Sequence, residues 1–148
     1  MSMRHCSLVL LIFLFAAGCG SEAPTDESSA IPDVIRTESV RFLTSDGFTI
    51  SGTWFTSNRQ QDAWPVVVLL HQFGGTHAQW TSFVPNLVER GYLVLAYDLR
   101  GHGLSERPGT GYSLDDHVLD AAAILDSLGL GDRKVTVVGN SFGGRIAL

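Results

Sequence analysis

The sequence predicts an α/β fold in which parallel strands are covered by helices on both faces of the sheet. Three largely apolar runs, at 66–70, 93–97 and 135–138, have the length and composition of buried strands. Segments with apolar residues at helical spacing separate these runs, at 80–90 and 114–128. Strands that alternate with helices along a chain are typical of a parallel sheet.

The amino-terminal 34 residues differ in composition from the rest of the chain. An apolar run at 8–17 follows Arg4 and is too short to span a bilayer, which is typical of the core of a secretory signal. Residues 19–34 are rich in Ser, Pro, Thr and acids and contain few large apolar side chains. We therefore expect a signal peptide at 1–18 and a flexible tether at 19–34.

The end of the predicted signal peptide carries a cysteine, Cys19, behind small residues. The segment 16–19, Ala-Ala-Gly-Cys, resembles the lipobox of bacterial lipoproteins, in which the signal is cut before the cysteine and the thiol receives lipid. This resemblance implies an exported protein of the bacterial cell envelope, anchored to a membrane through lipid on Cys19. An ordinary signal peptide cleaved nearby, leaving a secreted or periplasmic soluble protein, is the alternative. Cys6 lies inside the predicted signal peptide, so the exported domain has no second cysteine for a disulfide.

Two strands joined by a tight turn are predicted at 35–55. Apolar side chains alternate with polar or small ones on both sides of the Ser-Asp-Gly sequence at 45–47, which has turn chemistry. We expect an antiparallel hairpin that begins the sheet. The polar segment at 56–63 is predicted to be a loop.

Both predicted helices carry end signals. The helix at 80–90 is followed by Gly91, a residue that commonly ends helices. Ser113 is a candidate cap for the second helix, with Asp116 as its capping-box partner and Gly129 at the other end. The apolar stripe of this helix is predicted to comprise Leu114, Val118, Ala121, Ala122, Leu125 and Leu128.

The segment Gly139-Asn140-Ser141-Phe142-Gly143 connects the third strand to a further helix-forming tail. A serine held at the apex of such a strand-to-helix turn brings the residues two before and two after it close together. Only small side chains fit there, which explains Gly139 and Gly143. The pattern predicts a nucleophile elbow with Ser141 at its apex.

Two further motifs follow the other predicted parallel strands: His-Gln-Phe-Gly-Gly at 71–75 and Asp-Leu-Arg-Gly-His-Gly-Leu-Ser at 98–105. The carboxyl ends of parallel strands are where α/β sheets bind ligands. In order and spacing, the three motifs resemble the α/β-hydrolase superfamily over about residues 37–148. The resemblance implies a three-layer α/β-hydrolase-like domain at 35–148. It also implies a serine hydrolase that acts on an ester or related acyl substrate without a cofactor.

The resemblance assigns chemical roles to individual residues. Ser141 is the expected nucleophile, and the backbone N–H groups of Phe73 and Phe142 are the expected oxyanion hole. Gln72 stands where the family usually has glycine, which can bring its amide to the pocket.

The other polar residues near these motifs are predicted to be structural. Asp98 is expected to hydrogen-bond the loop at 100–103 rather than to serve as a catalytic acid. No group of His, Cys, Asp and Glu has the spacing of metal ligands, so no metal site is predicted. The histidines are expected in supporting loops (His71 and His102), in an ordinary loop (His77) and on a helix surface (His117).

In this family the nucleophile is followed along the chain by the catalytic acid and then by the histidine. The seven residues after Ser141 contain neither an acid nor a histidine. We therefore expect the chain to be the amino-terminal portion of a longer hydrolase, truncated after the elbow and inactive alone. The exposed apolar edge of the strand at 135–138 predicts that this product is poorly soluble or only partly folded.

Composition and motifs leave the substrate open. A formal net charge of −5 argues against a nucleic-acid partner. The two resemblances imply as partners a small acyl substrate and a membrane, reached through lipid on Cys19. The same frame also serves C–C hydrolases, peptidases and cofactor-free perhydrolases. A truncated, inactive lipoprotein that acts as a binding module is the alternative outside enzymes.

Overall fold

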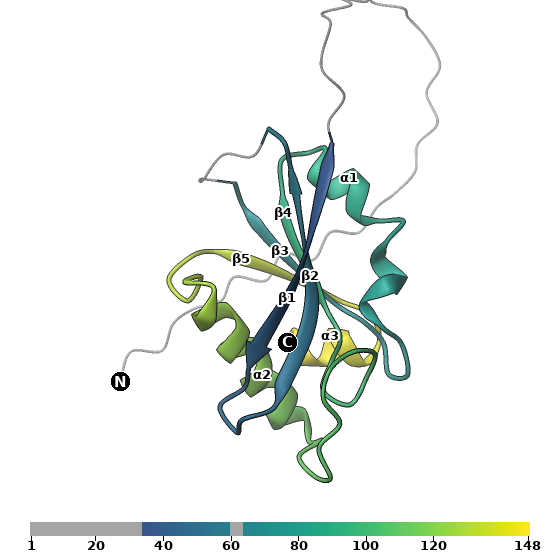
Figure 1. Ribbon diagram of the computed structural model, residues 1–148, viewed down its shortest axis with the longest axis vertical. Coiled ribbons are helices and arrows are strands. Elements are labelled where there is room, and N and C mark those ends of the chain that lie inside the picture. The colour runs from purple at the N-terminus through teal and green to yellow at the C-terminus, as the bar shows by residue number, and fades with distance from the viewer. Residues whose placement is uncertain (1–33, 60–63) are drawn as a thin grey trace, which may run out of the picture. The chain divides into compact units, whose positions relative to one another are not determined.

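The computed structural model describes residues 34–59 and 64–148, which contain a five-stranded sheet in the order β1-β2-β4-β3-β5 (Figure 1). The predicted signal peptide, Cys19 and all but the last residue of the predicted tether lie outside the described residues. No helix in the described ranges combines the length and the apolar character that a membrane crossing requires.

The amino-terminal hairpin is confirmed. Strands β1 (Ile35–Leu43) and β2 (Thr49–Ser57) pair antiparallel, with Ile35 opposite Ser57. Strand β2 therefore runs two residues into the segment predicted to be a loop. Gly47 ends the turn with a φ of 86°, a conformation that favours glycine.

The parallel part of the sheet is also confirmed. Strands β4 (Leu93–Tyr97) and β5 (Val135–Gly139) both pair parallel to β3 (Val66–Leu70), which lies between them. Every residue of β3 and β4 is buried, as expected of strands covered on both faces. Strand β5 lies at the edge of the described sheet, and its residues are only partly buried.

The single helix predicted at 80–90 is wrong. The structure has a short 3₁₀ helix, η1 (His77–Trp80), and a separate helix, α1 (Val84–Val88). Pro85 lies in the first turn of α1, where its missing N–H costs nothing, but it would remove a hydrogen bond from a helix that continued from Trp80.

Helix α2 (Leu114–Ser127) begins with the predicted capping box, in which Asp116 N–H donates to Ser113 Oγ and Ser113 N–H donates to Asp116 Oδ2. The predicted apolar stripe is partly wrong, because Val118 is 43% exposed. The buried face instead carries His117, Asp120 and Ile124.

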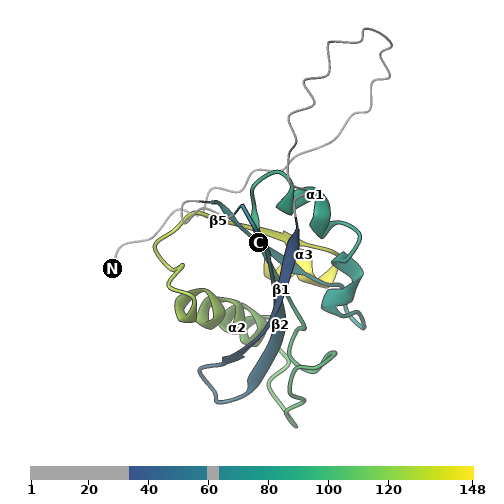
Figure 2. The same cartoon turned by 45° about the horizontal axis from the view of Figure 1, so that its top comes forward.

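The domain has three layers, which confirms the predicted fold class. Helix α1 packs on one face of the sheet with Val67, Leu69, Val94 and Ala96 (Figure 2). Helices α2 and α3 (Phe142–Ile146) pack on the other face, where Ile124 and Ile146 join a larger core cluster. This arrangement leaves the carboxyl ends of β3, β4 and β5 at one edge of the sheet, where the three sequence motifs meet.

Candidate active site

The turn between β5 and α3 has the backbone geometry of an elbow. Ser141 has φ 52° and ψ −110° and is the one non-glycine residue with positive φ in the described part of the chain. Such a conformation costs a serine about 1–3 kcal/mol, so the surrounding structure must impose it. The Ser141 side chain caps no N–H of α3, and the residue is exposed.

The two glycines that flank the turn are sterically required. A Cβ added to Gly139 would overlap the carbonyl group of Gly143, and a Cβ added to Gly143 would overlap the carbonyl oxygen of Leu70. The close approach of strand, turn and helix predicted from the sequence is therefore present. Its effect is to hold Ser141 at the apex, beyond the end of β3.

The loop after β3 lies beside the elbow. Gly74 has a φ of 74°, and its N–H donates to His102 Nε2 at 3.1 Å. The Phe73 and Phe142 rings meet edge to face, with centroids 6.2 Å apart. Within residues 34–59 and 64–148, neither Phe73 N–H nor Phe142 N–H is engaged in a hydrogen bond, so both donors are available to a ligand.

Gln72 connects this loop to the elbow. Its Oε1 accepts a hydrogen bond from Asn140 Nδ2 at 3.3 Å, and Asn140 immediately precedes Ser141. The amide that was predicted to be able to reach the pocket is thus directed at the Asn140 side chain, and Gln72 does not line the neighbouring cavity.

His71 links the loop after β3 to the loop after β4 through its ring nitrogens. It is fully buried, its Nε2 accepts from Leu99 N–H at 2.9 Å, and its Nδ1 lies 2.7 Å from the Gln72 carbonyl oxygen. Because Nε2 accepts, the proton resides on Nδ1 and donates to that carbonyl. Burial lowers the pKa of His71, which keeps the ring neutral. This is the supporting role expected from the sequence.

Asp98, which follows β4, organises two loops. Its carboxylate accepts from the N–H and the Nδ1 of His77, at 2.7 and 2.8 Å, and from Leu104 N–H at 2.8 Å. Burial alone would raise the pKa of Asp98, but these hydrogen bonds together hold it below its usual value. The prediction of a structural Asp98 agrees with this geometry, although its partners are His77 and Leu104 rather than the segment 100–103.

Sequence reasoning missed a buried ion-pair network centred on Arg100. Its guanidinium is 2% exposed and donates to both carboxylate oxygens of Asp120, at 2.9 and 2.6 Å, and of Asp46, at 2.7 and 3.0 Å. Hydrogen bonding to Arg100 lowers the pKa of Asp46 to about 2. An acid at position 120, among apolar residues of the α2 pattern, was the signal in the sequence.

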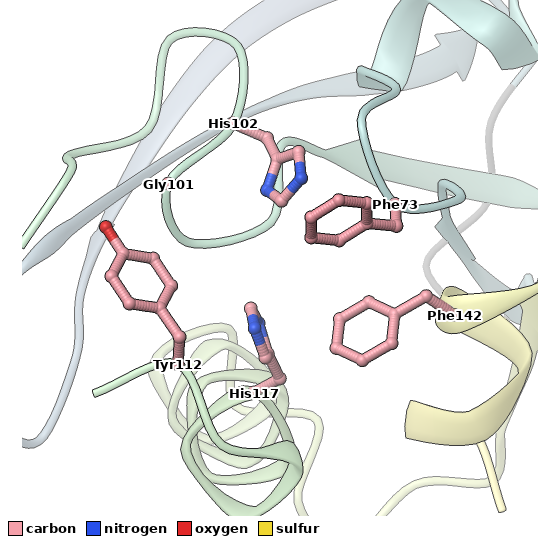
Figure 3. A pocket seen from close by; sticks show the side chains of 6 residues that line it. All are labelled: Phe73, Gly101, His102, Tyr112, His117 and Phe142. Atoms are coloured by element: carbon pink, nitrogen blue, oxygen red, sulfur yellow. The ribbon is translucent and has the colours of Figure 1, made fainter. Parts of the chain in front are cut away.

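A cavity of about 470 Å³ opens beside the elbow. Figure 3 shows rings from the loop after β3, the loop after β4, the start of α2 and the start of α3 arranged around it. No Lys, Arg, Asp or Glu side chain of the described residues lines it. The lining residues are Phe73, Gly101, His102, Tyr112, His117 and Phe142.

The predicted exposure of His117 is wrong. The residue is 2% exposed and projects from α2 toward the cavity (Figure 3). Its ring meets the Phe142 ring edge to face at 5.0 Å, and burial lowers its pKa. The position could have been inferred from spacing, because His117 precedes Ile124 by two helical turns and so shares its buried face.

No three His, Cys, Asp or Glu side chains in the described ranges converge in a way that could hold a metal ion. The Ser141 hydroxyl and the free N–H groups of Phe73 and Phe142 belong to the segments that follow β5 and β3 at this edge of the sheet. A hydroxyl beside two backbone donors is the arrangement needed to form and stabilise a tetrahedral adduct at a carbonyl carbon.

Comparison with known proteins identifies the fold family of the chain. A family model described as "alpha/beta hydrolase fold" matches residues 65–148. A non-heme haloperoxidase of Rhodococcus erythropolis is 49% identical over 65 residues, which cover 44% of this chain and 23% of that protein. A non-heme chloroperoxidase of Streptomyces lividans is 35% identical over 101 residues, covering 68% of this chain and 34% of that protein.

Solved structures with a similar fold include two hydrolases. An esterase from Exiguobacterium antarcticum superposes with a TM-score of 0.66 at 28% identity, covering 74% of this chain and 38% of the esterase. An epoxide hydrolase from an endophytic Streptomyces superposes with a TM-score of 0.64 at 31% identity, covering 75% of this chain and 31% of that enzyme. The chain thus spans about a quarter to a third of the curated relatives.

Proposed function

The chain belongs to the alpha/beta hydrolase fold family, and on that premise we propose that it supplies the nucleophile and oxyanion hole of a serine hydrolase. Ser141 attacks the carbonyl carbon of an ester or related acyl substrate, and the bond from that carbon to the leaving group breaks, releasing the protonated alcohol or equivalent group. The oxyanion accepts hydrogen bonds from Phe73 N–H and Phe142 N–H, and water releases the acid from the acyl-enzyme.

The observation that carries this proposal is the conformation of Ser141. A positive φ at a non-glycine residue is strained, and strain of this kind concentrates at functional sites. The close packing at the flanking glycines imposes this conformation on position 141. A glycine would adopt it at lower cost, yet the residue there is a serine. The free N–H groups of the neighbouring residues would stabilise the oxyanion that forms when the exposed hydroxyl attacks a carbonyl carbon.

The general base of this reaction is not supplied by a described histidine. Ring nitrogens of His71 and His102 accept from backbone N–H groups, and His77 is held between Asp98 and Thr53. His117 packs against the Phe142 ring, and no hydrogen bond within the described ranges links it to Ser141. We propose that the base and its acid lie in a part of the complete protein outside the described residues. On this view the described residues alone form an incomplete, inactive site.

The test is fluorophosphonate labelling of the complete protein expressed from its gene. Wild type should be labelled and Ser141→Ala should not, because the probe forms a covalent bond with an activated serine oxygen. Ser127→Ala, at an exposed serine of α2, is the matched control and should be labelled like wild type. Equal labelling of wild type and Ser141→Ala would defeat the assignment. Absence of labelling in all three would favour a binding module without catalysis.

A second candidate is cofactor-free perhydrolase activity, favoured by the similarity to a non-heme haloperoxidase and a non-heme chloroperoxidase. Here hydrogen peroxide takes the place of water, so that its oxygen attacks the acyl-enzyme carbonyl and the products are a peracid and free Ser141. Peracid formed from an ester and peroxide by wild type, and not by Ser141→Ala, would support it. Ester hydrolysis that continues unchanged in peroxide, with no peracid, would exclude it.

We also propose that the protein is exported and anchored through lipid on Cys19, on the strength of the small residues before that cysteine. Radiolabelled palmitate supplied to expressing bacteria should enter wild type and not Cys19→Ser. Equal incorporation into both would leave the ordinary cleaved signal peptide as the better interpretation.

A further inference from the structure

Two histidines line the cavity beside the elbow, and their hydrogen bonding differs. His102 Nε2 accepts from Gly74 N–H at 3.1 Å, and its Nδ1 donates to the Arg100 carbonyl oxygen at 2.9 Å. His117 is more deeply buried, and its Nδ1 has no partner among the described residues. The other ring nitrogen, Nε2, also makes no hydrogen bond within the described ranges, and because His117 lines the cavity, a ligand there can pair with its ring.

The other walls of the cavity are rings. Phe73 meets His102 and Phe142 edge to face, at centroid distances of 5.4 and 6.2 Å. Rings in this arrangement favour a further aromatic ring packed against their faces and edges. The volume of about 470 Å³ lies within the range of small-ligand sites. Phe73 is 75% exposed and Tyr112 46% exposed, so a ligand can enter past this rim.

The cavity adjoins the proposed reaction centre through two shared residues. Phe73 and Phe142 line it with their side chains, and their backbone N–H groups are the proposed oxyanion donors. A substrate whose carbonyl oxygen lies on these donors can therefore place an attached group between the two rings. This step depends on the proposed hydrolase function.

The chemistry of His117 restricts the type of substrate group that can occupy the cavity. Burial lowers the pKa of the ring, so it is neutral at pH 7. A neutral imidazole offers one N–H donor and one bare nitrogen acceptor. A hydroxyl group both donates and accepts, so it complements either tautomer, whereas a carboxylate or an ammonium group would find no Lys, Arg, Asp or Glu side chain of opposite charge in the lining.

We propose that the cavity is a substrate subsite for a hydroxyl-bearing aromatic ring, which packs against Phe73 and Phe142 and hydrogen-bonds His117 through its hydroxyl group. His117 is then a specificity-determining residue for phenolic acyl substrates. The hydrolase acts preferentially on esters that carry such a ring.

The test measures binding of p-cresol and toluene to the complete protein with Ser141→Ala, by titration calorimetry or ligand-observed NMR. The two probes differ only in the hydroxyl group. In the His117→Phe background, which keeps a ring of similar size and its contact with Phe142, the p-cresol to toluene affinity ratio should fall about 3- to 10-fold. Val118→Ala, at the exposed neighbouring position, should leave the ratio unchanged.

An unchanged ratio in His117→Phe would overturn the proposal, as would failure of both probes to bind at millimolar concentration, which would mean that other parts of the protein fill the cavity. Should His117→Phe fail to fold, Tyr112→Ala at the half-exposed rim provides a second test and should weaken both probes. Unaltered affinities in that variant would equally overturn the assigned location.

A catalytic measurement separates this inference from the proposed function. In wild type, kcat/KM for methyl 4-hydroxyphenylacetate or 4-hydroxybenzyl acetate should exceed that for the unsubstituted ester, and His117→Phe should remove the preference. Binding to Ser141→Ala needs no catalysis, so it can succeed even where fluorophosphonate labelling fails. If wild type is labelled but His117→Phe leaves the ester preference unchanged, the serine hydrolase assignment stands and the proposed subsite is wrong.

Discussion

The loop after β4 and the elbow after β5 lie at the same edge of the sheet but are built in opposite ways. In the loop, the buried charges of Asp98 and Arg100 are surrounded by hydrogen-bond partners within the protein. In the elbow, Ser141 is strained, exposed and without a capping contact to α3. The loop holds its charges through hydrogen bonds, whereas the elbow keeps an unfavourable conformation through the close packing of Gly139 and Gly143 against their neighbours.

The largest expected effect comes from removing the Arg100 guanidinium, whose hydrogen bonds are all made within the protein. Arg100→Met leaves Asp120 buried without its cation, which should lower the free energy of unfolding by about 3–5 kcal/mol. Thermal or urea denaturation of the complete protein measures this. Arg41→Met, at an exposed position of β1, is the control and should change stability by less than about 0.5 kcal/mol. Equal effects of the two substitutions would show that the network is not structural.

The next effect tests the close packing of the elbow. Gly143→Ala forces a Cβ into the Leu70 carbonyl and should lower the free energy of unfolding by about 1–3 kcal/mol, with loss of fluorophosphonate labelling. Gly144→Ala adds a Cβ whose nearest atom, the Gly139 carbonyl oxygen, is 3.3 Å away, and it should cost much less. If Gly144→Ala proved the more damaging of the two, the tight contact between elbow and β3 would be in question.

A smaller effect of opposite sign is expected at the apex. Ser141→Gly relieves the positive φ and should raise the free energy of unfolding by about 1 kcal/mol while it abolishes labelling. Ser141→Ala abolishes labelling without that gain, because alanine has the same Cβ. Denaturation curves of both variants distinguish them, and a destabilised Ser141→Gly would contradict the interpretation of stored strain.

The last effect, for which only an upper bound can be given, concerns pH. Burial lowers the pKa of His71 and of His117 from 6.5, so the unfolded chain binds protons first as the pH falls below that value. Stability should therefore be complete above about pH 6.5 and decline below it, by at most about 1.4 kcal/mol per histidine for each pH unit. A further decline should follow between pH 3.8 and about 2, where the unfolded form of Asp46 is protonated before the folded form.

Melting temperatures at pH 7.5 and 5.5 measure the first decline. His117→Phe should reduce the difference between these temperatures, and Val118→Ala should not. A pH dependence that His117→Phe leaves unaltered would mean that His117 takes up its proton equally in both states.

Local sequence was enough for much of the fold because the signals are local. Apolar runs predicted β3 and β4, the capping box predicted the start of α2, and small residues around Ser141 predicted a tight turn. The prediction of one helix at 80–90 was wrong because it followed the apolar spacing and ignored Pro85. Spacing reports which face is buried, whereas proline decides whether the backbone can continue.

Polar residues of the site were harder to predict. His117 and Asp120 lie on the buried face of α2 because Phe142 and Arg100 meet them there, and those partners are distant in the sequence. A pattern of apolar residues along one helix cannot show such partners, so both residues were overlooked or placed at the surface.

The sequence by itself determined the fold class, the order of the three motifs and the position of Ser141 between strand and helix, because backbone propensity, hydrophobic periodicity and steric size act over a few residues. Only the tertiary structure decided which histidines are engaged, which carboxylates hold Arg100, and that His117 faces a cavity. These features depend on contacts between segments about 20 to 70 residues apart, as in Arg100 with Asp120 and Gln72 with Asn140. The chemistry of the site is set by those contacts, since burial and hydrogen bonding decide the protonation of each group.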